Sequence, residues 1–278
     1  MPELAEVEFF RRRWEVGVGD RVLAVEAHPK VRVFRHGTKR PAVETLRGAV
    51  FKRSFRHGKQ LLLQFSGEKW LGVHLGMSGE LRVEPKPGDY RPGKHDHLAL
   101  FQAKRVLVFS DPRQFGRIRF DKGAKVPEWF GTLPPEIGSP EFTADLVHRF
   151  LQRRARTPIK SILLMQECFP GLGNWMCDEV LFQARIAPRT LGGRFSQEAA
   201  TLLWKKIGTV AAGALKYVAG MRESLPEAYG AYGALPVNWL FNHRWSDGGT
   251  CPVSGQPLRR EVIGGRMTCW SPALQRPL

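Results

Sequence analysis

Apolar and polar positions follow two different periods along the chain. From Pro2 to about Val16 the apolar residues recur at helical spacing, and proline is tolerated at the start of a helix because its missing N–H is not needed there. From Arg21 to Phe120 the pattern changes to short apolar or alternating runs, separated by glycine, proline and charged turns. These runs predict a β-sandwich or barrel, and they include Val22–Val25, Gln60–Phe65, Trp70–Leu75, His97–Phe101 and Val106–Phe109.

The second half of the chain has the pattern of a helical unit. A stretch around Leu133–Pro140 that is rich in proline and glycine indicates a linker. Helical spacing of apolar residues then recurs at four places, which are Phe142–Leu151, Ile159–Gln166, Trp175–Ala184 and Glu198–Tyr217. Two extended runs near the C-terminus, Pro257–Val262 and Arg266–Trp270, lie among glycines and predict a β-hairpin. We therefore expect an α+β fold divided into residues 1–135, 136–237 and 238–278.

The charge balance indicates what kind of partner the protein binds. The 278 residues include 43 Lys and Arg against 26 Asp and Glu, a formal net charge of +17. Such an excess predicts a polyanionic partner, although a generally basic composition would give the same number. Four irregularly spaced cysteines do not form a disulfide framework, and no apolar stretch reaches membrane-spanning length. The start of the chain also lacks the positive charge of a signal peptide, so we expect a soluble cytoplasmic protein.

Pro2 is the first candidate for chemistry. If Met1 is removed, Pro2 presents a secondary α-amine, and such amines have a pKa of roughly 7.7–8.0, so a usable fraction is neutral and nucleophilic. Attack on a sugar C1′ would displace a base and form an iminium ion. That cation would acidify the C2′ protons and so promote β-elimination of the 3′ phosphate. The competing interpretation is that Pro2 only begins a helix.

Two carboxylates follow this proline at helical spacing. Glu3 could act as a general acid, and Glu6 lies about one turn further on, so both could face the amine. The alternative is an acidic first turn that complements the helix dipole.

Six short motifs resemble one family in their order and spacing. They are PELAEVE from residue 2, HGKQLLL at 57–63, HLGMSG at 74–79, KHDH at 94–97, DPRQFG at 111–116 and GLGNWMCDEVLFQARIAP at 171–188. The chain resembles the formamidopyrimidine-DNA glycosylase and endonuclease VIII family from end to end. This resemblance implies an N-terminal helix with a β-sandwich, a helix-two-turn-helix domain and a C-terminal hairpin finger. It also implies a base-excision repair enzyme that acts on damaged double-stranded DNA held in a cleft between its domains, at the bacterial nucleoid. Because such a cleft recognises DNA without a two-fold partner, we expect a monomer, and no membrane partner is expected.

The resemblance implies roles for four catalytic residues. Pro2 would be the Schiff-base nucleophile, and Glu3 would protonate the sugar oxygen as the ring opens, with Glu6 in support. Lys59 would transfer protons during β-elimination and contact the DNA near the lesion. Arg266 would grip the phosphates beside the lesion and assist the second, δ-elimination.

The family pattern also implies DNA contacts. Free N–H groups at the helix start that follows Gly171 and Gly173 suit a phosphate. Asn174 is expected to contact the DNA backbone, and His95 and Arg113 match further DNA contacts of the family. Phosphate ligands are also expected at Lys160, Arg154 and Arg156. A plug that fills the gap left by the extruded base is expected from Met77, Arg113 and Phe115, a set that resembles the purine-lesion branch.

The C-terminal module departs from the zinc finger of most family members. Of the four ligand positions, Cys251 is kept, but the others are Ser254, Ser271 and Leu274. Tetrahedral zinc needs thiolate or imidazole at all four, so we expect no cofactor and a zincless finger. A residual site from Cys251, Cys269 and His243 is disfavoured because Cys269 lies off the ligand position. The hairpin would then be held by packing, with a small core of Trp239, Phe241, Trp245 and Trp270.

Lesion preference is the least determined feature. Ala5 and Met165 depart from the family's usual residues, and Met221–Pro236 does not match the loop that caps 8-oxoguanine in bacterial members. Ring-opened formamidopyrimidines or further-oxidised purines are therefore expected to be better substrates than 8-oxoguanine. Two alternatives stay open: an oxidised-pyrimidine glycosylase of the same fold, and a non-catalytic protein that binds damaged DNA.

Overall fold

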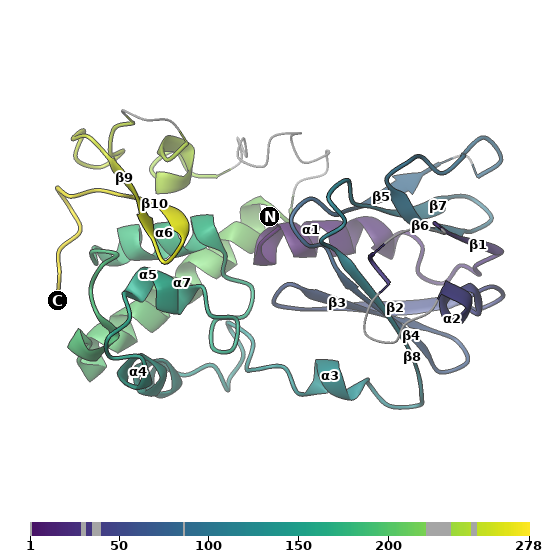
Figure 1. The fold of residues 1–278 in the computed structure, drawn as a ribbon, viewed down its shortest axis with the longest axis horizontal. Coiled ribbons are helices and arrows are strands. Elements are labelled where there is room, and N and C mark those ends of the chain that lie inside the picture. Colours follow the sequence, from purple (N-terminus) through teal and green to yellow (C-terminus); the bar gives the residue numbers. More distant parts are fainter. Residues whose placement is uncertain (1, 29–31, 35–39, 86, 221–234, 246–248) are drawn as a thin grey trace. The chain divides into compact units, whose positions relative to one another are not determined.

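The computed structural model describes residues 2–28, 32–34, 40–85, 87–220, 235–245 and 249–278 (Figure 1). These residues form two compact units, with a boundary between Leu133 and Pro134. Glu3–Ala5 belong to the second unit, and the hairpin groups with the helices there. The expected α+β class is confirmed, and the three-part division of the chain stays a prediction.

The first unit contains helix α1 from Glu6 onward and eight strands in two four-stranded antiparallel sheets. The sheet orders are β1-β6-β7-β5 and β2-β3-β4-β8. The elements are α1 (Leu4–Glu15), β1 (Ala24–Ala27), α2 (Arg40–Glu44), β2 (Phe51–His57), β3 (Gln60–Phe65), β4 (Lys69–His74), β5 (Glu80–Glu84), β6 (Asp96–Phe101), β7 (Val106–Ser110), β8 (Arg117–Lys122) and α3 (Glu128–Gly131).

The second sheet determines where the polar side chains of this unit lie. Gln60 of β3, His74 of β4 and Arg117 of β8 are directly paired across the strands. Gly72 and Arg119 are paired one step along the same face, because side chains two residues apart in a strand point to the same side. The sequence pattern thus places a row of polar groups on one face of this sheet.

The second unit is built around helices α6 and α7. Its elements are α4 (Ala144–Arg153), α5 (Ile159–Leu163), α6 (Asn174–Ala184), α7 (Gln197–Tyr217), two 3₁₀ turns at Gly192–Arg194 and Leu240–His243, and the antiparallel strands β9 (Arg259–Ile263) and β10 (Arg266–Trp270). Thr143 and Ser196 cap α4 and α7 by accepting a backbone N–H, which explains why these helices begin there. Helix α5 ends at Leu163 rather than Gln166.

The hairpin packs on α6 through a small apolar cluster. Phe182, Leu240, Cys251 and Cys269 are buried together in it. The expected aromatic core is only partly present, since Trp239 and Phe241 belong to the main helical core while Trp245 is 45% exposed. Trp270 instead donates its indole N–H to Glu261 across the hairpin, at 2.9 Å.

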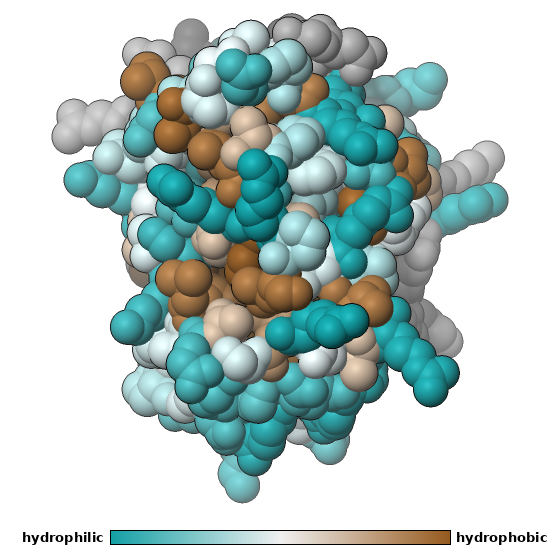
Figure 2. All heavy atoms as spheres, turned by 90° about the vertical axis from the view of Figure 1, so that its left-hand side faces the viewer, coloured by the Kyte–Doolittle hydropathy of each residue, from teal (hydrophilic) through white to brown (hydrophobic). Residues whose placement is uncertain are grey.

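The surface of the structure is mixed in character. On the face shown in Figure 2, hydrophilic side chains separate smaller apolar groups. Among the described residues, no helix is long and apolar enough to cross a membrane.

Candidate active site

Glu3 caps the N-terminus of α6. Its Oε2 accepts the N–H groups of Gly173 (2.9 Å) and Met176 (3.1 Å), and its Oε1 accepts that of Trp175 (3.0 Å). The side chain is buried, at 2% exposure. The first N–H groups of a helix lack partners within the helix, and the positive end of its dipole favours a carboxylate there. The carboxylate predicted to act as the acid is therefore fixed in one position.

Gly173 is required by this arrangement. A Cβ at this position would lie 2.2 Å from Cδ of Glu3, closer than any side chain tolerates. Sequence reasoning assigned the N–H groups after Gly171 and Gly173 to a phosphate. The structure corrects that expectation, because the N–H groups of Gly173, Trp175 and Met176 already donate to Glu3.

Asn174 connects α6 to the hairpin. Its side-chain amide donates to the carbonyl of Met267 at 2.8 Å, directly beside Arg266. Arg266 begins β10 and is exposed. The two residues predicted to contact phosphates are thus held together within this unit.

Lys160 does not lie on a surface, contrary to expectation. Its side chain is fully buried and donates to Asp178 (2.5 Å) and to the carbonyl of Asn174 (2.8 Å). Asp178 also accepts from Arg244 (2.5 Å) and from the N–H of Cys269 (3.1 Å). A lysine used in this way cannot reach a phosphate, so its predicted role is wrong and it instead holds α5, α6 and the hairpin together.

The other two predicted phosphate ligands lie at the surface. Arg156 is exposed, and Arg154 donates to Glu167 at 2.6 Å while its guanidinium stacks on Phe150. Their contact with DNA stays a prediction.

Asp111 organises the predicted plug in the first unit. Its carboxylate accepts from the hydroxyl of Ser78 (2.6 Å) and from the N–H of Gly116 (2.7 Å), which ties the loop at 75–79 to the loop at 111–116. A Cβ on Gly76, whose φ is +67°, would lie 2.4 Å from the backbone of Phe115, so only glycine fits between the loops.

The plug residues themselves remain accessible. Phe115 is 48% exposed, the Arg113 guanidinium stacks over its ring at 5.0 Å, and Met77 is half-buried. Phe115 is a large apolar side chain that stays exposed on a loop held in place by hydrogen bonds, so it is available to insert into a stack of bases.

Lys59 lies in the two-residue turn between β2 and β3, where Gly58 has a φ of +54°.

Burial, and then the charges of Arg117 and Lys59, lower the pKa of His74 to about 4. His74 Nδ1 accepts the N–H of Gly76, so the neutral ring carries its proton on Nε2. Sequence reasoning missed His74, although HLGMSG contains it.

Three further predicted positions lie in the first unit. Pro2 and Glu6 are buried at the start of the chain, and His95 is half-buried, with its carbonyl accepting the N–H of Asp111 at 3.0 Å. Residues 221–234, which belong to the segment predicted not to match the capping loop, lie outside the described part of the chain.

The hairpin's donor set does not fit zinc. Cys251 accepts the N–H of Ser254 at 3.4 Å, Ser271 donates its N–H to Gln275, and Leu274 has no donor atom. In the ranges that the structure describes, no three His, Cys, Asp or Glu side chains are placed to hold a metal ion. His243 is engaged with the carbonyl of Val237 at 2.9 Å.

Known proteins resemble this chain over nearly its whole length. The model of the formamidopyrimidine-DNA glycosylase N-terminal domain matches residues 1–118, and that of the H2TH domain of the same enzyme matches residues 133–224. The chain is 34% identical over 282 residues to a formamidopyrimidine-DNA glycosylase of Paraburkholderia xenovorans, covering 99% of this chain and 100% of the relative. It is 33% identical over 280 residues to that of Thermus thermophilus, covering 99% and 98%.

Solved structures give the same relationship. A Lactococcus lactis formamidopyrimidine-DNA glycosylase bound to DNA with an AP site superposes with a TM-score of 0.83 at 26% identity, over 99% of both chains. The same enzyme with an N7-benzyl-Fapy-dG DNA gives 0.84 at 28% identity, over 99% of this chain and 100% of that one. With two family models that together match most of its length, this chain belongs to the formamidopyrimidine-DNA glycosylase family.

Proposed function

We propose that this protein is a bifunctional DNA glycosylase and AP lyase of base-excision repair, and that it removes oxidised bases through a Schiff base on Pro2. The observation that carries the proposal is the fixed carboxylate of Glu3 directly beside Pro2 in the chain. Only a carboxylate with a set position can serve the same amine in every turnover.

The first step uses Pro2 and Glu3 together. The Pro2 ammonium passes a proton to the carboxylate of Glu3, which gives a neutral amine and a protonated acid. The amine attacks the sugar C1′, and the bond from C1′ to the base breaks as the base leaves with the electron pair. The base takes up the proton that the Pro2 nitrogen loses once it is bonded to C1′. Glu3 then donates its proton to the sugar ring oxygen as the ring opens, which leaves an iminium ion between Pro2 and C1′.

The lyase steps follow from the iminium ion. It withdraws electrons from C2′, a C2′ proton is removed, and the C3′–oxygen bond breaks with release of the 3′ phosphate. A second elimination releases the 5′ phosphate. We assign the proton transfer to Lys59 and assistance of the second elimination to Arg266, which is exposed on the hairpin and held near α6 by the bond from Asn174 to Met267.

The preferred substrates are formamidopyrimidines, 8-oxoguanine or further-oxidised purines. The exposed Phe115 with its stacked Arg113, and the nearby Met77, support a plug of the purine-lesion type. The Lactococcus relative has also been solved with DNA that contains an oxidised pyrimidine, which keeps oxidised-pyrimidine activity as the second candidate. We further propose that the protein acts as a monomer in the cytoplasm and without zinc.

Borohydride trapping tests the covalent mechanism. Purified protein with verified Met1 removal is mixed with duplex DNA that carries a formamidopyrimidine, 8-oxoguanine or an AP site, and borohydride reduces the iminium ion to a stable amine. An adduct that survives denaturation is expected. It should vanish when an added N-terminal residue moves the free amine, and it should weaken greatly in Pro2→Gly and Glu3→Gln.

The contrary result is also informative. If no adduct forms on any damaged base or AP site while DNA binding stays tight, the enzyme assignment is overturned and the non-catalytic binding protein is left. Comparing trapping rates among the lesions decides between the purine and pyrimidine candidates.

A further inference from the structure

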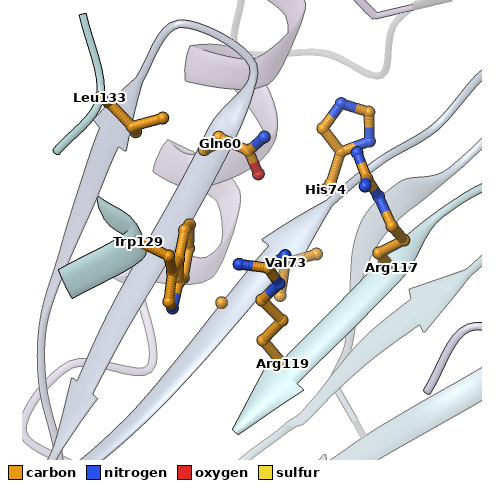
Figure 3. A pocket seen from close by; sticks show the side chains of 8 residues that line it. Gln60, Val73, His74, Arg117, Arg119, Trp129 and Leu133 are labelled. Atoms are coloured by element: carbon orange, nitrogen blue, oxygen red, sulfur yellow. The ribbon is translucent and has the colours of Figure 1, made fainter. Parts of the chain in front are cut away.

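A cationic pocket lies on the polar face of the second sheet of the first unit. Figure 3 shows its walls: Trp129 on one side, His74 and Arg117 on the other, and Gln60 with Arg119 between them. Its volume is about 240 Å³. Ligand pockets for whole drug-sized molecules measure roughly 300–1,000 Å³, so this one suits a smaller group.

The charge of the pocket is positive. Arg117 and Arg119 both contribute to its lining, and none of the described lining residues is a carboxylate. Asp121 lies further along the same face of β8, but it accepts the indole N–H of Trp129 at 3.0 Å. An anion that enters therefore meets two guanidinium groups.

His74 adds a neutral donor. Burial, and to a smaller extent the charges of Arg117 and Lys59, lowers the pKa of His74 and keeps the ring uncharged. Because its Nδ1 accepts from Gly76, its Nε2 offers an N–H. A neutral N–H donor of this kind gives an anion one more hydrogen bond beside the two guanidinium groups.

The pocket is preformed rather than a chance gap. The Arg119 guanidinium stacks over the Trp129 ring at 4.9 Å, which limits its rotamers. Trp129 in turn lies against Gly72, where a Cβ would come 2.5 Å from the ring. A glycine in a central strand that leaves room for a tryptophan fixes the pocket's wall in place.

We propose that this pocket binds one phosphate group of the nucleic acid strand. Guanidinium groups recognise phosphate oxygens with paired hydrogen bonds, and a phosphodiester matches the pocket in size and charge. Arg117 and Arg119 lie beyond the DPRQFG motif at 111–116, so the motifs that carry the family resemblance do not include them. The choice of DNA as the source of the phosphate rests on the proposed function.

Salt dependence of binding is the test. Affinity for a duplex with an uncleavable tetrahydrofuran abasic analogue is measured between about 50 and 300 mM salt for the protein and for Arg117→Gln/Arg119→Gln. If the double variant has lost the contact that neutralises one phosphate, its slope of log affinity against log salt should be smaller in magnitude by about 0.9. The control pair Arg47→Gln/Arg91→Gln removes the same charge from exposed positions of this unit and should change the slope much less.

A second arm separates a strand phosphate from a free one. Inorganic phosphate is titrated while the tryptophan fluorescence is followed, with Trp129→Phe to identify the pocket's signal. A slope that drops only in the pocket pair supports the proposal. An unchanged slope overturns it, even when free phosphate alters the Trp129 signal, and so does an equal drop in both pairs.

The abasic analogue keeps this test independent of the chemistry at Pro2. The expected drop in slope together with failed borohydride trapping would overturn the proposed function alone. Normal trapping with an unchanged slope would overturn only the phosphate pocket.

Discussion

Replacing Gly173 with alanine tests whether the position of Glu3 is set by α6. The new Cβ would lie 2.2 Å from Cδ, 2.4 Å from Oε1 and 2.5 Å from Cγ of Glu3. Ordinary contacts between such atoms are roughly 3.5–4.0 Å, so the carboxylate must move by about 1 Å or more. The backbone of α6 is fixed by its own hydrogen bonds, and so the movement falls on Glu3.

The expected losses of stability and of reaction rate are estimated separately. Each hydrogen bond to a charged group is worth about 1.5–3 kcal/mol, and water can replace some of the three that are broken, so we expect the free energy of unfolding to fall by about 2–4 kcal/mol. Misplacing a reacting group by about 1 Å costs on the order of 10²-fold in rate. The rate should therefore fall far more than DNA affinity, which depends on many contacts across the surface.

Single-turnover base excision measures this rate with protein in excess over DNA. It is run at a temperature where circular dichroism shows the variant to be folded, and binding to the abasic analogue is measured alongside. Gly208→Ala is the matched control, because a Cβ there meets nothing within 4 Å and alanine favours the helix α7 that contains it.

An excision rate within about threefold of the unmodified protein would refute the reasoning, given the distances above. It would mean either that the carboxylate has no fixed role or that α6 yields more easily than its hydrogen bonds imply. A rate loss that is matched by an equal loss of affinity would point to damaged DNA binding instead.

Four more outcomes are expected. Asp178→Asn leaves the buried cations Lys160 and Arg244 short of a counter-charge, so urea unfolding should show a loss of about 3–5 kcal/mol, and a loss below about 1 kcal/mol would contradict the network. Phe115→Ala should change stability by less than about 0.5 kcal/mol because the ring is exposed, yet slow excision from duplex DNA more than from single strands; equal slowing on both would argue against a plug. Because the pKa of His74 is lowered to about 4 in the folded protein, its contribution to stability is complete above the unfolded pKa of roughly 6.5 and is lost as pH falls toward 4. Between about pH 7.5 and 4.5 the free energy of unfolding should therefore drop about 1–3 kcal/mol less in His74→Asn than in the unmodified protein. Chelators should leave excision unchanged, and elemental analysis should find no stoichiometric zinc. Inactivation by a chelator would instead show that the hairpin holds a metal.

The sequence predicted the elements better than the contacts between them. Alternating runs predicted Gln60–Phe65 as a strand with correct bounds, because buried leucines in a short run leave few other options. The cap on α6 was missed since Glu3 and Gly173 are 170 positions apart, and no local pattern reports such a pairing.

The burial of Lys160 did have a signal. Asp178 and Glu179 interrupt an apolar run from Trp175 to Phe182 in α6, and a carboxylate in such a place needs a hydrogen-bonding or cationic partner. The pocket beside Arg119 could not be predicted in the same way, because the wall formed by Trp129 comes from a four-residue helix with no strong periodicity.

The backbone contact between Gly76 and Phe115 constrains how this protein can change over evolution. An insertion or deletion in either loop would separate them and displace the three residues of the predicted plug, whereas exchange of a side chain at 77, 113 or 115 leaves the carboxylate of Asp111 and both loops undisturbed. Lineages that share this contact should therefore diversify their lesion range through substitutions at the tips while keeping both loop lengths constant.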